Sequence, residues 1–99
     1  MSLARRRIVW KFQLDVTHEI QSVYIPHGRI VHVAMQGHSP TMWAECDPDS
    51  KAEHRAFFVI GTGWDFPKGH SLEHRGTCIS NGGTFVWHVY EAISLETKS

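Results

Sequence analysis

Residues 8–14 run Ile8-Val9-Trp10-Lys11-Phe12-Gln13-Leu14, which is the clearest strand signal in the chain. The first residue and every second one after it are apolar, whereas the positions between them include Lys11 and Gln13. Since successive side chains of a strand point to opposite faces, this alternation gives one apolar face and one wetter face. The stretch therefore predicts a strand with one buried face.

Six further runs of β-branched and aromatic residues follow, and turn-forming residues separate them. We expect strands over residues 19–25, 29–36, 42–47, 53–60, 72–80 and 84–93. No stretch sustains the apolar spacing i, i+3, i+4, i+7 that an amphipathic helix needs. The sequence therefore predicts an all-β fold of about seven strands, either a small β-sandwich or a partly open barrel.

Turn residues indicate that hairpins connect most of these strands. Pro26-His27-Gly28 combines a residue of fixed φ with one that tolerates positive φ, so we expect a hairpin between the second and third runs. Asn81-Gly82 is typical of a type I′ turn, in which both central residues need φ > 0. This pair predicts a hairpin between the last two runs.

The length and composition fit one hydrophobic core. A chain of 99 residues, 41% of them hydrophobic and including four Trp and five Phe, is long enough for one core but not for two. We expect a single all-β domain over residues 8–93, with flexible termini at residues 1–7 and 94–99.

Charge and cysteine usage narrow the class of protein. Ten basic residues balance ten acidic ones, so no net charge draws the chain toward nucleic acid or lipid, while low net charge favours self-association. Cys46 and Cys78 lack the spacing of a disulfide framework or a metal site. No window approaches the roughly 20 apolar residues of a membrane helix. We therefore expect a cytoplasmic protein with reduced thiols and no membrane association.

One predicted strand, Ala56-Phe57-Phe58-Val59-Ile60, is apolar on both faces. Such a run is typical of a central strand that is covered on both sides, or of a strand whose second face meets a partner chain. In the second alternative the protein is a homo-oligomer. Its interface is then formed by this strand or by a sheet edge expected at Phe85–Tyr90. In the first alternative both segments belong to the core.

The longest stretch outside the predicted strands is residues 61–71, which contain Trp64 and Phe66. Large aromatic side chains are costly to leave in water. The segment therefore either folds back as a lid over the core, which is the more common arrangement, or meets a ligand or partner.

The eight histidines raise the question of a metal site. His70 and His74 would share a face only in a helix, because four residues of strand separate side chains by about 13 Å. A metal site could also be assembled from side chains on different strands. The candidate ligands in predicted strands are His32, His54, His74 and His88, with Cys46 or Cys78. We predict neither a metal nor another cofactor.

Catalytic signatures are weak in this chain. Cys78 with a histidine and an acid could form a nucleophilic triad, but geometry rather than residue type defines such triads. Gly61-Thr62-Gly63 lacks the helix that follows a dinucleotide-binding fingerprint. We predict no catalytic residue, and a small metal-dependent enzyme is a less favoured alternative.

A second alternative is a protein of the OB type that binds single-stranded nucleic acid. Its surface would combine basic residues with Trp64 and Phe66. The candidate basic residues are Arg5, Arg6, Arg7, Arg29, Arg55 and Arg75. Net neutrality weakens this interpretation, so a nucleic-acid partner is not expected.

Four motifs occur along the chain: Met42-Trp43-Ala44-Glu45-Cys46-Asp47-Pro48, Phe58-Val59-Ile60-Gly61-Thr62-Gly63, His74-Arg75-Gly76-Thr77 and Gly83-Thr84-Phe85-Val86-Trp87-His88-Val89-Tyr90-Glu91. Together they resemble a family of small uncharacterised proteins of bacteriophages and prophages, over residues 11–91. The resemblance carries no catalytic assignment. It implies a phage or prophage gene context. We expect a non-enzymatic accessory protein of the host cytoplasm that binds a protein or a small molecule and self-associates.

The loop aromatics and these motifs together indicate where a ligand pocket would lie. We expect it near Gly61, Thr62, Gly63, Trp64 and Phe66. His74 and His88 are polar groups that could orient a ligand there.

Overall fold

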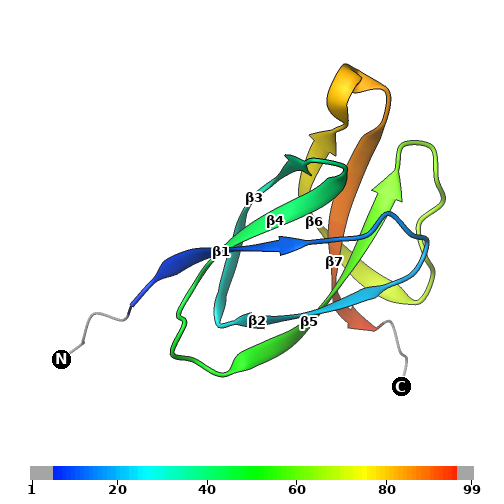
Figure 1. Ribbon diagram of the computed structural model, residues 1–99. Helices are drawn as coiled ribbons and strands as arrows, with labels where there is room; N and C mark the ends of the chain where they lie inside the picture. Colours follow the sequence, from blue (N-terminus) through cyan, green and yellow to red (C-terminus); the bar gives the residue numbers. More distant parts are fainter. Residues whose placement is uncertain (1–5, 96–99) are drawn as a thin grey trace.

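The computed structural model describes residues 6–95 and confirms the all-β prediction (Figure 1). Within these residues lie seven strands and one short 3-10 helix. They are β1 (Ile8–Gln13), β2 (Gln21–Pro26), β3 (Gly28–Gln36), β4 (Ser39–Cys46), β5 (Ala52–Gly61), β6 (His70–Ile79), η1 (Asn81–Gly83) and β7 (Val86–Leu95). Of the termini expected at residues 1–7 and 94–99, residues 1–5 and 96–99 lie outside the described residues.

The strands form two antiparallel sheets that pack as a sandwich. One sheet has the strand order β1-β4-β3, and the other has the order β2-β5-β7-β6. The alternating stretch at the start of the chain is β1, which pairs with β4 from Ile8↔Cys46 to Gln13↔Thr41. Strands far apart in the sequence therefore lie side by side in each sheet (Figure 1).

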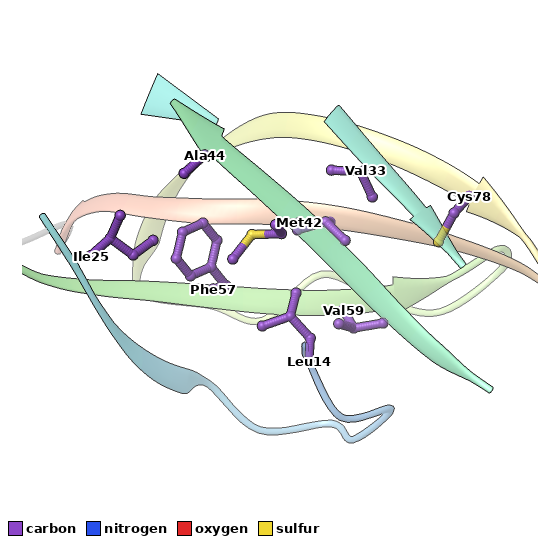
Figure 2. Close-up of a cluster of buried hydrophobic side chains, with 9 residues drawn as sticks. Leu14, Ile25, Val33, Met42, Ala44, Phe57, Val59 and Cys78 are labelled. Atoms are coloured by element: carbon purple, nitrogen blue, oxygen red, sulfur yellow. The ribbon is translucent and has the colours of Figure 1, made fainter. Parts of the chain in front are cut away.

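Apolar side chains from both sheets fill the space between them (Figure 2). The buried cluster consists of Leu14, Ile25, Val33, Met42, Ala44, Phe57, Val59, Cys78 and Val89. Phe57 and Met42, from opposite sheets, are both fully buried. Burial of one such side chain contributes roughly 1.5–3 kcal/mol to the free energy of unfolding, so this cluster is the main source of stability.

The prediction of a hairpin at Pro26-His27-Gly28 is wrong, because these residues form a corner between the two sheets. β2 pairs with β5, whereas β3 pairs with β4. A Cβ atom at Gly28 would collide with the Glu45 carbonyl oxygen and with Cys46. The His27 carbonyl accepts a hydrogen bond from the Asp47 N–H at 2.9 Å, which closes the corner. Glycine is needed here for close backbone approach rather than for a hairpin turn.

Two of the connections between the described strands are hairpins, so hairpins are fewer than the turn residues indicated. One joins β3 to β4 and the other joins β6 to β7. The second hairpin was predicted, but its two-residue type I′ turn is wrong. Positive φ values occur at Gly82 (83°) and Gly83 (77°), not at Asn81. Ser80 instead closes a longer turn: its N–H donates to the Phe85 carbonyl (2.8 Å), and its hydroxyl accepts from the Phe85 N–H (2.9 Å).

The doubly apolar strand is the central strand β5, covered on both faces within the chain. Phe57 and Val59 face the core, while Phe58 and Ile60 are buried on the opposite, outer face of the sheet. β7 lies between β5 and β6, so the edge expected at Phe85–Tyr90 is wrong. Neither segment leaves an open sheet edge for a partner.

The outer face is covered by the connection between β5 and β6, residues 62–69, which we call the crossover segment. Since β5 and β6 are both antiparallel to β7, they run parallel to each other. Their connection must therefore return along the length of the sheet and cross the outer face of β7. Eight residues are few for this path, so the segment is held close against the sheet.

Candidate ligand-binding site

The crossover segment and the outer face of the four-stranded sheet line an open pocket of about 210 Å³. Its lining residues are Ile60, Gly61, Thr62, Gly63, Trp64, Phe66, His88 and Tyr90. Six of the seven residues that the sequence indicated for a ligand pocket are among them. The seventh, His74, does not line the pocket. Its ring contacts Tyr90, which does, and Thr77, which lies beside His88.

Strand register explains why these side chains meet. Ile60 lies opposite His88, and Phe58 lies opposite Tyr90, in the β5–β7 pair. On the other side of β7, Thr77 lies opposite His88, and His74 lies opposite Tyr90. A register shift between His74 and Gly76 keeps both β6 side chains on the outer face, although they are three residues apart.

Trp64 folds back as the lid that the sequence suggested. Its N–H donates to the Gly61 carbonyl at 3.0 Å, in a turn where Gly63 has φ 91°. The indole stacks on the His18 ring, with centroids 4.2 Å apart, and meets Trp87 edge-on at 5.6 Å. A Cβ atom at Gly61 would lie 2.8 Å from the indole. Trp64 is therefore packed against the sheet.

Phe66 differs from Trp64, because its side chain remains 51% exposed. Its ring meets Tyr90 edge-on, with centroids 4.9 Å apart. Tyr90 in turn meets the His74 ring at 5.1 Å. Phe66 thus forms an open aromatic wall of the pocket, available to a bound molecule.

A chain of hydrogen bonds runs from β6 across β7 to the pocket. His74 Nε2 lies 2.9 Å from Thr77 Oγ1, which lies 3.0 Å from His88 Nδ1. His88 Nε2 lies 2.9 Å from Thr62 Oγ1, and the Thr62 hydroxyl makes a long contact of 3.5 Å with the Val86 carbonyl. The chain therefore ends at the Thr62 hydroxyl, beside the pocket.

The other candidate metal ligands lie apart. No group of three or more His, Cys, Asp or Glu side chains that could hold a metal occurs among residues 6–95. The His32 ring contacts Trp43, and the His54 ring contacts Tyr24. His70 packs edge-on against Phe58. Of the histidines considered for convergence, His74 and His88 meet, through Thr77.

Both thiols are buried rather than presented to a substrate. Burial raises the pKa of Cys78, whose sulfur lies 3.6 Å from the Met35 sulfur in the core. Burial also raises the pKa of Cys46, against a hydrogen bond with the Trp10 backbone that lowers it. Since the thiolate is the nucleophilic form, neither cysteine is activated for catalysis.

The sequence interpretation missed an ion network at one end of the core face. Glu91 is only 6% exposed and accepts hydrogen bonds from Arg55 at 2.7 and 2.8 Å and from Arg75 at 2.9 Å. Burial alone would raise the pKa of Glu91, but these bonds and charges outweigh it and hold the pKa below its ordinary value. The alternation of the last strand could have indicated this network. Glu91 lies two residues after Val89 and four after Trp87, so it is on the same, core-facing side of the strand.

This network also changes the interpretation of the basic residues. Arg55 and Arg75 face Glu91, so they do not form an open stripe with Trp64 and Phe66. Arg7 and Arg29 both pair with Glu45, at 3.3 and 3.1 Å, beside a hollow of about 350 Å³. Arg6 pairs with Asp49, and Arg5 lies outside the described residues. The charges at that hollow already compensate one another, so we do not place the site there.

Among residues 6–95, no helix is long and apolar enough to cross a membrane. Comparisons with curated proteins and with solved structures found no match. A family described as a domain of unknown function (DUF7352) matches residues 5–98. Because this match covers almost the whole chain, the protein belongs to the DUF7352 family.

Proposed function

We propose that this protein is a non-enzymatic binding module and that the pocket under the crossover segment is its binding site. One observation carries the proposal: an exposed aromatic wall, Phe66, borders a pocket that also contains hydrogen-bonding groups, Thr62 and His88. Aromatic walls with a few converging polar groups are typical of ligand sites. The buried, high-pKa thiols favour binding over covalent catalysis.

The proposed setting is that of a phage or prophage accessory factor in the host cytoplasm. The motifs Gly61-Thr62-Gly63 and Phe85–Glu91, on which the resemblance to phage proteins rests, contribute Gly61, Thr62, Gly63, His88 and Tyr90 to the pocket. The pocket and the resemblance thus depend on the same residues. The partner in this setting is a protein or a small molecule of the host or the phage.

We also propose that the protein self-associates, through β1 rather than through the doubly apolar strand. β1 is an edge strand of its sheet, and its Val9 and Trp10 side chains are exposed. An apolar edge strand is a template for pairing with a second copy. In sedimentation velocity we expect a dimer for the wild type and a monomer for Val9→Lys; a wild-type monomer at all concentrations contradicts this part of the proposal.

The binding proposal is tested by a thermal-shift screen of small fragments and short peptides against three proteins. These are the wild type, Phe66→Ala, and Phe85→Ala as a matched control. Phe85 is another half-exposed phenylalanine (57%) that packs on an aromatic ring but does not line the pocket. Ligands of the pocket raise the Tm of the wild type and of Phe85→Ala, but not that of Phe66→Ala. If no compound separates Phe66→Ala from the other two proteins, the pocket is not the binding site.

A further inference from the structure

We infer that the pocket selects a free small molecule with an uncharged planar ring and one polar group on its rim, and that Thr62 recognises that polar group. This inference rests on the proposed function, because it assumes that the pocket binds a ligand. It adds the chemical class of that ligand and the residue that determines specificity.

The size and walls of the pocket favour a ring. A volume of about 210 Å³ suits one ring or two fused rings rather than a drug-sized molecule. Trp64, Phe66 and Tyr90 supply aromatic walls, and Ile60 supplies an aliphatic one. Planar rings pack against such walls in edge-on or offset geometry.

The lining also favours a neutral ligand. No Asp, Glu, Lys or Arg side chain of the described residues lines this pocket. A charged ring would lose part of its hydration on entry without gaining an opposite charge, which is costly. The ion pairs formed by Glu91 and Glu45 lie elsewhere.

The hydrogen-bond chain lets Thr62 act as a donor or as an acceptor toward a ligand. A neutral imidazole has one donor and one acceptor nitrogen, so the chain has two self-consistent directions. In the first, His74 donates to Thr77, and Thr77 donates to His88 Nδ1. His88 Nε2–H then donates to Thr62. Among the described residues, the Thr62 hydroxyl hydrogen has only the Val86 carbonyl as acceptor, 3.5 Å away, so a ligand acceptor can replace that weak contact at little cost.

In the second direction every bond is reversed. Thr62 donates to His88 Nε2, His88 Nδ1–H donates to Thr77, and Thr77 donates to His74 Nε2. The Thr62 oxygen then has a lone pair for a ligand donor. Thr62 is therefore the polar group of the pocket best placed to recognise a ring substituent.

Matched small probes test this inference by NMR titration of the amides of Gly61, Thr62 and Gly63. Indole carries a donor and quinoline an acceptor, whereas 1-methylindole lacks the donor. Benzoate and benzylamine carry opposite charges. The proteins are the wild type and Thr62→Val, which keeps the side-chain shape and removes the hydroxyl; its spectrum without ligand shows whether the fold is retained.

We expect indole and quinoline to bind the wild type and the two charged rings to bind at least tenfold more weakly. One hydrogen bond corresponds to about a three- to tenfold preference for indole over 1-methylindole. Thr62→Val lowers that preference to about one and weakens quinoline by a similar factor. A preference that survives in Thr62→Val overturns the role of Thr62.

The remaining outcomes separate the inference from the proposed function. Binding of benzoate or benzylamine at these amides as tightly as indole overturns the neutral-ring class, while the pocket remains a binding site. Titrations in which no planar neutral probe moves these amides also overturn the inference. The proposed binding function is then still tested by the thermal-shift screen, which compares Phe66→Ala with Phe85→Ala.

Discussion

At the scale of single residues, Gly76 shows how tightly the two sheets are packed. It lies on β6, opposite Val89, where the four-stranded sheet approaches β3 of the other sheet. A Cβ atom at this position would lie 2.5 Å from the Val33 Cβ, which is closer than real carbon contacts. Val33 belongs to the buried core, so it has little room to move.

We predict that Gly76→Ala lowers the free energy of unfolding by about 2–3 kcal/mol, because the extra methyl group overpacks the core. Urea denaturation followed by tryptophan fluorescence measures the change. Gly37→Ala is the control, since a Cβ atom there meets nothing within 4 Å. Gly37 has φ +63°, so this control carries only a backbone strain of about 1 kcal/mol. Equal losses in the two variants contradict a close approach at Gly76.

Glu91 is the second residue on which the fold depends, and Glu45 is its natural control. Each carboxylate bridges two arginines, but Glu91 is buried with Arg55 and Arg75, whereas Arg7 and Arg29 beside Glu45 are exposed. We predict a loss of about 3 kcal/mol for Glu91→Gln, because partly buried Arg55 loses its counter-charge and Arg75 keeps only the exposed Glu73. For Glu45→Gln we expect less than about 1 kcal/mol. Urea denaturation of both variants at pH 7 measures the difference, and similar losses contradict the buried network.

The same carboxylate predicts how stability changes in acid. The arginines hold the folded-state pKa of Glu91 below its ordinary value of 4.5. The contribution of Glu91 is therefore complete above about pH 4.5 and is lost as the pH falls through the folded-state pKa. From pH 5 downward, the free energy of unfolding of the wild type should fall more steeply than that of Glu91→Gln. Parallel pH profiles contradict this assignment.

At the scale of elements, the crossover segment creates the site. It is short, and it must span the sheet from the end of β5 to the start of β6. Its Phe66 ring meets Tyr90 on the outer face, whereas Trp64 packs against Trp87 at the end of the core. The sequence indicated such a lid from Trp64 and Phe66. It could not show which of the two is packed, because that depends on the distant partners His18, Trp87 and Tyr90.

Substitution of Trp64 tests the lid. We predict that Trp64→Ala costs about 1–3 kcal/mol of stability, because the indole loses its contacts with His18 and Trp87. Phe66→Ala should cost less than about 1 kcal/mol, because that ring is half exposed. Thermal denaturation ranks the variants. A Trp64→Ala protein as stable as the wild type contradicts the lid and leaves Trp64 as a contact for a partner.

At the scale of the whole molecule, strand positions were predictable but strand neighbours were not. The alternation in residues 8–14 marks the strand β1, and Asn81-Gly82 marks a true hairpin. The expected buried face of β1 is wrong at Trp10, which is exposed because β1 is an edge strand. Periodicity reports which face a side chain takes, not which strand lies beside it. The pairing of β1 with β4, the corner at Gly28 and the interior position of β7 depend on contacts distant in the sequence.

The same limit applies to the candidate site. Gly61, Thr62, Gly63, Trp64 and Phe66 lie close together in the sequence, so their proximity was predictable. His88 joins them because β5 and β7 pair with Ile60 opposite His88. The Arg55–Glu91 ion pair also depends on how β5 and β7 are aligned. The sequence pattern of one strand does not show its alignment with another strand.

Intermolecular NOEs with indole show whether the pocket under the crossover segment binds a planar neutral ring. Ile60 is the isoleucine of the pocket, so its methyl groups report on that site. We predict NOEs from the indole protons to the Ile60 methyl groups and to the Phe66 and Tyr90 rings. NOEs instead to Met35 and Phe85, which line a different hollow, would show that the ring does not bind under the crossover segment.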